Sequence, residues 1–186
     1  MPGVVRILTA DDIPGERVLG LYAKDWPVYI KAGEVTRYIG DALACVVAET
    51  EAEARAAAAC VKVDYEVLTP LLDMEEAETS PIHIHENGNI LLDKTIRRGE
   101  PVDEALARCA FTAEATYRTQ AVEHAFIEPE ATLAVPEAGG VRLYVQSQGI
   151  WHDKTDIAAL LHVPTPKVTV TLADSGGAFG GKEDFT

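Results

Sequence analysis

The clearest secondary-structure pattern in the chain is LACVVAETEAEARAAAACVKVDYEV, residues 43–67. It opens with Leu43–Ala48, a short apolar run of the kind that forms a buried strand. Thr50 and Glu53 follow with the spacing of a capping box, in which each side chain accepts a hydrogen bond from the other residue's backbone amide. An alanine-rich helix is therefore expected after Thr50, running to about Cys60.

The second part of this stretch changes to a period of two. Apolar residues alternate with charged ones from Val61 to Val67, as in a strand with one buried face. The stretch thus predicts a strand-helix-strand unit, with a right-handed crossover if its strands are parallel neighbours. Cys45 and Cys60 are expected on buried faces, where free cysteine packs as a small apolar side chain.

The rest of the N-terminal half supplies further short strands. Val4–Leu8 and Trp26–Ile30 are suited to strands, and a turn-rich segment, DDIPG at residues 11–15, lies between them. Residues 1–78 are therefore predicted to form one α/β domain. Residues 79–101 hold Pro, Gly and polar residues without a sustained period, which indicates a linker.

Residues 102–186 are predicted to form a second, strand-rich portion of the chain. A short helix at Val102–Cys109 and a longer one at Asp153–Leu161 accompany the strands. The expected strands are Phe111–Tyr117, Glu130–Val135, Val141–Gln146 and Val168–Leu172. The predicted fold class is α+β, with mixed α/β character in the first domain.

The composition excludes several classes of protein. The chain has 186 residues, with 16 Lys and Arg against 30 Asp and Glu, a formal net charge of −14. Nucleic-acid binding is disfavoured, because clustered cations are needed to displace phosphate counterions. No apolar run approaches the roughly 18 residues of a membrane-spanning helix, and no signal pattern opens the chain. Three widely spaced cysteines favour neither disulfides nor zinc, so a reducing, cytoplasmic location is predicted.

The glycine-rich stretch SGGAFGGKE, residues 175–183, is the strongest chemical signal. Glycines let a backbone approach a ligand closely, and the exposed amides of such a turn donate to oxyanions. Gly176–Lys182 also satisfies the phosphate-loop pattern GxxxxGK, which raises a nucleotide-binding protein as an alternative. Glu183 argues against that alternative, because it stands where Ser or Thr would offer a hydroxyl to magnesium.

Two groups of histidines and carboxylates are weaker signals. In VEHAFIEPE, residues 122–130, the adjacent Glu123 and His124 point in different directions, so a buried, hydrogen-bonded His or Glu is favoured over a metal ligand. His83 and His85 share one face of an extended segment, but no further ligands accompany them. No metal-ligating residue is therefore predicted.

Gln148 lies just beyond the end of the predicted strand at residues 141–146. A glutamine amide at a strand end can donate to an oxo group or another ligand, or it can make a simple turn or capping contact. The residue type alone leaves both interpretations open.

Taken in order, these segments resemble the large molybdenum-bearing subunit or region of the xanthine dehydrogenase and aldehyde oxidase family of molybdenum hydroxylases. The resemblance covers nearly the whole chain. Similar to the family's α/β hammerhead domain are PGVVRILTADDIPG (residues 2–15), YIGDALA (38–44) and the acidic helix as far as DYE (64–66). Similar to the start of its molybdenum-cofactor-binding domain are EHAFIEP (123–129), SQG (147–149) and GGAFGGKE (176–183).

The resemblance implies roles for five residues. Gln148 matches the glutamine that hydrogen-bonds the molybdenum-oxo group, and Gly177 with the Phe179 and Gly180 turn matches the cofactor-binding loop beside the metal. Glu183 matches the carboxylate that binds and orients the heterocycle in purine-hydroxylating members, which favours a purine over an aldehyde as substrate. The reaction implied is hydroxylation with oxygen derived from water, the protein supplying positioning and electrostatic stabilisation.

The resemblance also implies cofactors and partners. The intact enzyme is expected to use a molybdenum-molybdopterin cofactor and to pass electrons to 2Fe-2S clusters and FAD on other domains or subunits. Family members extend further at both ends, and the general-base glutamate lies in the later part. The chain is therefore expected to be a piece of such a protein, or one product of a split gene, that binds no molybdenum stoichiometrically and is inactive alone. A non-catalytic subunit or assembly module is the alternative, and pairing with another copy through an open sheet edge is a further expectation.

Overall fold

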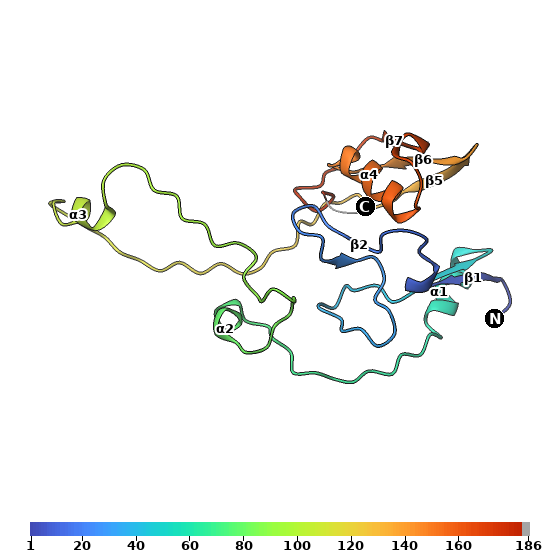
Figure 1. Ribbon diagram of the computed structural model, residues 1–186, viewed down its shortest axis with the longest axis horizontal. Coiled ribbons are helices and arrows are strands. Elements are labelled where there is room, and N and C mark those ends of the chain that lie inside the picture. The colour runs from blue at the N-terminus through green and yellow to red at the C-terminus, as the bar shows by residue number, and fades with distance from the viewer. Residues whose placement is uncertain (184–186) are drawn as a thin grey trace. The chain divides into compact units, whose positions relative to one another are not determined.

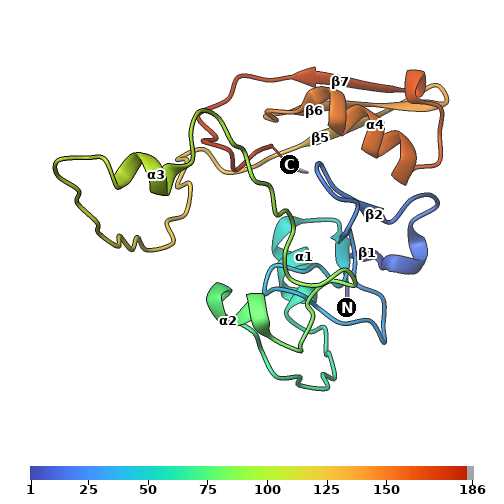
Figure 2. The same ribbon diagram turned by 60° about the vertical axis from the view of Figure 1, so that its left-hand side comes forward.

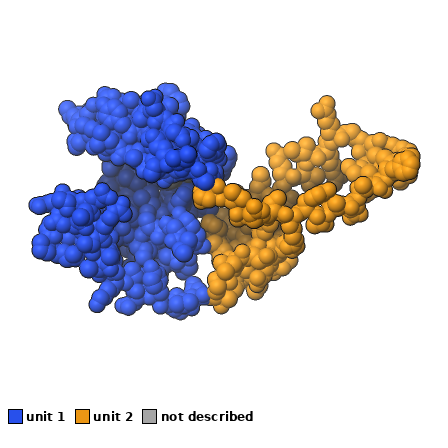
Figure 3. Space-filling model, turned by 180° about the vertical axis from the view of Figure 1, so that it is seen from behind, with its two compact units in different colours: residues 1–68, 124–186 blue, residues 69–123 orange. Residues whose placement is uncertain are grey.

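The computed structural model describes residues 1–183 and divides the chain into two compact units. Unit 1 combines Met1–Leu68 with His124–Thr186, and unit 2 is Thr69–Glu123 (Figure 3). Unit 1 is therefore built from both ends of the chain, and unit 2 is inserted between them in sequence. The predicted boundaries at residues 78 and 101 stay a prediction.

The first sheet of unit 1 has two strands, and a helix follows the second of them in sequence (Figure 1). β1 (Val4–Leu8) pairs antiparallel with β4 (Cys45–Ala48), and α1 (Glu51–Ala58) follows β4. At the start of α1 the Thr50 hydroxyl accepts a hydrogen bond from the Glu53 amide at 3.3 Å and donates to the Glu53 carboxylate at 2.8 Å. The helix thus begins where the capping pattern places it, although the Glu53 carboxylate meets the hydroxyl rather than the amide of Thr50.

The prediction of a strand at Val61–Val67 is wrong, because these residues are irregular and exposed. The strand that precedes the helix, β4, pairs antiparallel with β1 in a two-stranded sheet. Within the described part of the chain, no strand is then placed to pair with residues 61–67. The burial predicted for Cys45 and Cys60 is also wrong: both thiols are free and exposed, since this thin sheet buries little and Cys60 lies beyond the end of α1.

A second, smaller pair of strands lies between β1 and β4 in sequence. The 3-10 helix η1 (Ala10–Asp12) follows β1, and β2 (Val18–Leu19) then pairs antiparallel with β3 (Trp26–Pro27). The strand predicted at Trp26–Ile30 is thus confirmed only in its first two residues.

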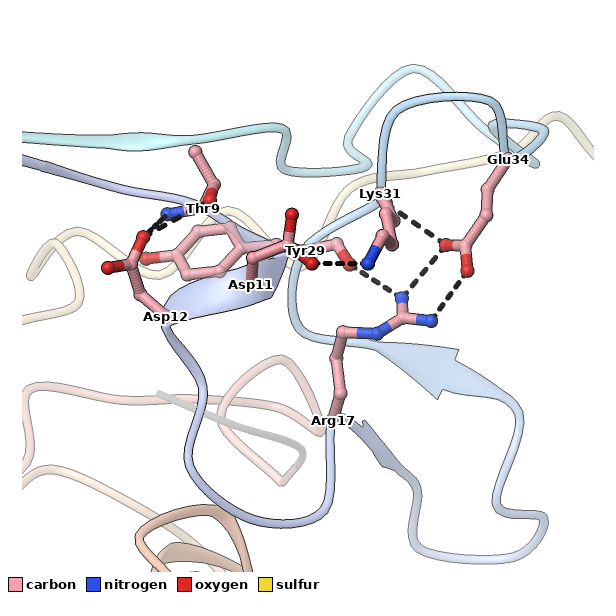
Figure 4. A network of polar contacts seen from close by, with 7 residues as sticks. All are labelled: Thr9, Asp11, Asp12, Arg17, Tyr29, Lys31 and Glu34. Atoms are coloured by element: carbon pink, nitrogen blue, oxygen red, sulfur yellow. Dashed lines mark hydrogen bonds and ion pairs between the residues drawn. The ribbon is translucent and has the colours of Figure 1, made fainter.

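A polar network holds the irregular segment that follows β3 (Figure 4). The Arg17 guanidinium donates to both carboxylate oxygens of Glu34, at 2.9 and 2.6 Å, and to the carbonyl of Tyr29 at 2.8 Å. The Lys31 amide donates to Glu34 at 3.0 Å, and the Lys31 ammonium pairs with Asp11. The Lys31 amide and the Arg17 guanidinium together lower the pKa of Glu34 below its ordinary value. Side-chain contacts therefore hold the segment after β3 in place of the backbone hydrogen bonds of a β-sheet.

The third sheet of unit 1 has three strands, in the order β5-β6-β7 (Figure 2). β5 (Leu133–Glu137) pairs antiparallel with β6 (Gly140–Val145), which pairs parallel with β7 (Val168–Leu172). α4 (Ile150–Leu160) and the 3-10 helix η2 (Thr165–Lys167) connect the two parallel strands. A parallel strand-helix-strand unit is therefore present, but it lies here rather than in the stretch that predicted it.

The core of this part consists of Leu143, Val145, Ala158 and Val168, each no more than 5% exposed. These side chains join β6, β7 and α4. The predictions of two strands and a helix in this region are thus confirmed.

Unit 2 contains α2 (Met74–Thr79) and α3 (Val102–Leu106) and is otherwise irregular. The predicted strand at Phe111–Tyr117 is wrong: these residues are irregular, and Phe111 is 93% exposed. The predicted helix at residues 102–109 is confirmed over five residues. No helix among the described residues is long and apolar enough to cross a membrane.

Candidate functional site

Three segments of unit 1 that are far apart in sequence meet beyond the ends of β6 and β7. They are the residues 124–128, the residues 146–149 that follow β6, and the glycine-rich loop 176–183 that follows β7. All three contain motifs that the sequence analysis singled out. Hydrogen bonds, an ion pair and ring contacts connect them.

Gln148 and Lys182 hold one another reciprocally. The Gln148 amide N–H donates to the Lys182 carbonyl at 2.8 Å. In return, the Gln148 side-chain oxygen Oε1 accepts from the amides of Gly180 at 3.0 Å and Lys182 at 3.3 Å. Two backbone donors on one oxygen fix which end of the side-chain amide is the acceptor. The Nε2 group is thereby left as the donor that Gln148 presents to a ligand.

Lys182 is fully buried, which the sequence analysis did not foresee. Its Nζ lies 3.4 Å from the Glu128 carboxylate and 4.7 Å from the centre of the Phe126 ring, so an ion pair and a cation-π contact both stabilise it. An ammonium held in this way is not available to a phosphate. Nucleotide binding is therefore disfavoured on two grounds: Lys182 is not free to bind phosphate, and position 183 has no hydroxyl for magnesium.

Glycine is required at position 181 because the rings of Phe126 and His124 lie close to its Cα, and not because of its backbone angles. A Cβ on Gly181 would lie 2.6 Å from Phe126 Cε1 and 3.1 Å from two ring atoms of His124. The loop therefore packs its backbone directly against the residues 124–128, and no larger residue fits there without movement of the rings.

The tip of the loop is strained and rich in free donors. Phe179 has a φ of 53°, an uncommon value for a residue with a side chain, and its ring is 76% exposed. Within residues 1–183, the amides of Gly177, Ala178 and Phe179 donate to no acceptor. Strained backbone with unused amide donors is typical of a ligand-binding loop.

Glu183 is exposed, in contrast to the buried Lys182 before it. Its backbone carbonyl lies close to Gly149, 3.2 Å from where a Cβ on that glycine would stand. Glu183 and Gln148 are thus brought to the same place, one at the end of the glycine-rich loop and the other just after β6.

A buried polar pair lies behind Gln148. The Ser147 hydroxyl accepts a hydrogen bond from the Gly149 amide at 2.8 Å and also bonds to Asp153 in the first turn of α4. Ser147 and Asp153 are 6% and 8% exposed. Burial raises the pKa of Asp153, and the hydrogen bond from Ser147 opposes that shift in part. The pair anchors the turn that carries Gln148 to the helix that follows.

The histidines and carboxylates of the second motif divide into two groups. Glu128 is hydrogen-bonded, as predicted, but it is only half-buried, and His124 is exposed and lies near Gly180 and Gly181. In the part of the chain that the structure describes, no group of three or more His, Cys, Asp or Glu side chains could hold a metal ion. No sequence signal points to the buried position of Lys182, because its partners Phe126 and Glu128 are more than 50 residues away.

Comparisons with known protein families match both parts of the chain. Residues 1–69 match the family model described as aldehyde oxidase and xanthine dehydrogenase, a/b hammerhead domain, and residues 82–186 match the molybdopterin cofactor-binding domain. The second match contains all three segments of the site.

Individual relatives agree with these family models. A probable xanthine dehydrogenase subunit of Bacillus subtilis is 34% identical over 187 residues, covering 100% of this chain and 25% of that protein. The nicotinate dehydrogenase large molybdopterin subunit of Eubacterium barkeri is 36% identical, covering 99% of this chain and 43% of that subunit. The chain therefore spans less than half the length of either relative.

A solved structure has the same fold. The aldehyde oxidoreductase of Desulfovibrio gigas superimposes with a TM-score of 0.87 and 28% sequence identity, covering 98% of this chain and 21% of that chain. The fold of this chain thus occurs within a much longer protein.

Proposed function

Because the chain belongs to the aldehyde oxidase and xanthine dehydrogenase family, we propose that it supplies part of the molybdopterin-binding site of a molybdenum hydroxylase. The intact enzyme hydroxylates a purine or a related N-heterocycle, with an aldehyde as the second candidate substrate. The observation that carries the proposal is the Gln148 side chain, whose Oε1 is held by two loop amides so that Nε2 is presented as a donor.

The residues at the site fit the cofactor by the chemistry of their donors. Molybdenum-molybdopterin carries oxygen atoms that accept hydrogen bonds, and the site offers Gln148 Nε2 and the unused amides at residues 177–179. The cofactor, when bound, supplies the two-electron oxidation of a carbon atom with oxygen from water. Gly177, Phe179 and Gly180 would hold the cofactor from the glycine-rich loop, and Gln148 Nε2 would donate a hydrogen bond to one of its oxygen atoms. Oriented donors of this kind need no rearrangement during reaction.

Glu183 binds and orients the substrate in this proposal. Its side chain is exposed beside the Gln148 turn, and a carboxylate can accept hydrogen bonds from the ring N–H groups of a purine. Two relatives support a heterocyclic substrate by their descriptions, one as a xanthine dehydrogenase and one as a nicotinate dehydrogenase. The structural relative is described as an aldehyde oxidoreductase, which keeps aldehydes as the second candidate.

Partners complete the proposed enzyme. The remaining part of the molybdenum-binding region, 2Fe-2S clusters and FAD reside on other domains or subunits, and the chain alone turns over no substrate. A role as a non-catalytic subunit or assembly module finds support in the exposed apolar side chains of unit 2, among them Phe111 at 93% and Tyr117 at 88%. Three free cysteines support a reducing, cytoplasmic location.

The test is reconstitution with the rest of the molybdenum-binding region. Molybdenum content is measured by metal analysis, and turnover is measured with xanthine, nicotinate and benzaldehyde. We expect Gln148→Ala to lower kcat for every substrate by about 100-fold. We expect Glu183→Gln to lower kcat/KM for xanthine by at least about tenfold and to leave benzaldehyde unaffected. Glu130→Gln, at an exposed position outside the site, is the matched control.

Two results would refute parts of the proposal. Unchanged xanthine turnover in Glu183→Gln would remove the substrate-binding role of that carboxylate. About one molybdenum per molecule of the isolated chain would show that the chain holds the cofactor without the remaining region.

A further inference from the structure

We propose that Glu128 is a positioning residue that clamps the two ends of the glycine-rich loop and, through Lys182, sets the orientation of the Gln148 amide. The consequence for turnover rests on the function proposed above, whereas the clamp itself can be tested in the chain alone. Nothing in the resemblance or in the comparisons assigns a role to Glu128.

Glu128 contacts both ends of the loop with the same oxygen. Its Oε2 accepts a hydrogen bond from the Gly176 amide at the start of the loop and receives the Lys182 ammonium, 3.4 Å away, at its end. The Gln146 side chain, which follows β6, also helps to lower the pKa of the Glu128 carboxyl. One carboxylate thus holds donors from the two ends of the loop.

The backbone of Glu128 is suited to a fixed position. Pro129 restricts the residue before it to extended conformations, which limits the directions in which the Glu128 side chain points. The Gly176 amide and the Lys182 ammonium lower the pKa of Glu128 below its ordinary value, so the carboxylate is charged at neutral pH. A charged acceptor holds amide donors more strongly than a neutral one.

Lys182 transmits the effect of this carboxylate to Gln148. The Lys182 side chain points to Glu128 and Phe126, while its backbone amide and carbonyl both bond to Gln148. Removal of Glu128 would leave a fully buried ammonium without its counter-charge, which is strongly unfavourable. Lys182 would then leave its site, and Gln148 Oε1 would lose the donors that orient the amide.

The clamp is tested by hydrogen exchange of single amides, measured by NMR on the chain. In Glu128→Ala we expect the amides of Gly176, Gly180 and Lys182 to exchange at least about tenfold faster. In Lys182→Met, which keeps the buried stem without the charge, we expect faster exchange at Gly180 and residue 182, with Gly176 still protected by Glu128. Glu130→Ala removes a carboxylate two residues away and should change none of them.

The orientation of Gln148 is read from its side-chain NH2 resonances. We expect the two signals to be displaced from the chemical shifts of a solvent-exposed glutamine in the wild-type chain and in Glu130→Ala, and to lie close to those shifts in Glu128→Ala. In the reconstituted enzyme, Glu128→Ala should lower kcat without raising KM, and it should have no further effect when Gln148→Ala is already present. A merely structural role would instead add to the effect of Gln148→Ala.

Protection of all three amides in a folded Glu128→Ala chain would overturn the clamp, and so would unaltered Gln148 signals. If Glu128→Ala fails to fold, the Lys182→Met pattern decides: equal exchange of Gly180 in that variant and the wild type would refute the coupling. Failure of the function proposed above would appear as absent turnover in the wild-type enzyme, with the exchange results unaffected.

Discussion

Substitution of Gly181 by alanine should destabilise unit 1 by about 2 kcal/mol, within the range of about 1–3 kcal/mol for overpacking. The added Cβ would lie 2.6 Å from Phe126 Cε1, whereas carbon atoms pack best at about 3.5–4.0 Å, so the ring must move by about 1 Å. That ring lies beneath the ammonium of Lys182, which limits its movement. Backbone strain plays no part, because φ of Gly181 is not positive.

Two other glycines separate the clash from backbone strain. Gly180 has a φ of 94° and no atom closer than 3.6 Å to the ideal Cβ, so alanine there meets strain alone, about 1–2 kcal/mol. Gly33 has a φ of 91° and nothing within 4 Å, which makes Gly33→Ala the matched control outside the site. Phe126→Leu should relieve Gly181→Ala by at least about 1 kcal/mol but should not relieve Gly180→Ala.

The assay is urea unfolding followed by circular dichroism, with the free energy of unfolding compared across the series. The reasoning is refuted if Gly181→Ala is no less stable than wild type, or if Phe126→Leu adds to its cost instead of reducing it. A similar loss of unfolding free energy in Gly33→Ala and Gly180→Ala would indicate that both substitutions cause backbone strain alone, without a steric clash.

Three further predictions use the same unfolding assay. Val168→Ala should lower the free energy of unfolding by about 2–3 kcal/mol, because two methyl groups and their contacts are lost at a residue that is 0% exposed. Val67 is 90% exposed, so Val67→Ala should change the free energy of unfolding by no more than about 0.5 kcal/mol. Burial raises the pKa of Asp153 above its ordinary 3.8, so the folded state binds the proton more tightly than the unfolded state does. The free energy of unfolding should therefore fall as pH rises from about 3.8 through the folded-state pKa. Asp153→Asn, which can still accept a hydrogen bond from Ser147, should abolish this fall, and an unchanged pH profile would contradict the prediction. The pKa of Glu34 is lowered, so its contribution to folding stability is complete above pH 4.5 and is lost as pH falls through the folded-state pKa. Glu34→Gln should lower the free energy of unfolding by under about 1 kcal/mol at pH 7 and should not change it at pH 2. An equal loss at both pH values would contradict this prediction.

Local patterns in the sequence predicted local structure well. The Thr50 cap and the strands β1, β6 and β7 lie where they were predicted within one residue, and α4 begins three residues before its predicted start. Such features depend on neighbours a few residues away, so a single chain segment contains the information. The glycine-rich loop was recognisable for the same reason.

Pairing of strands was not predictable in this way. Residues 61–67 have the alternation of a strand yet remain irregular, because alternation states which face would be buried and not whether a partner strand exists. The same limit explains Phe111–Tyr117 and the exposure of Cys45.

The residue types of the candidate site can be recognised in the chain alone: a glutamine after a strand, a glycine-rich loop and a carboxylate after a lysine. Their contacts depend on the folded structure. It buried Lys182 against Glu128 and Phe126, 54 residues from Glu128 in sequence, and it placed the Gln148 oxygen on two loop amides. Charge pairing and amide orientation depend on distance in space, and residues so far apart in the chain come close only when the chain folds.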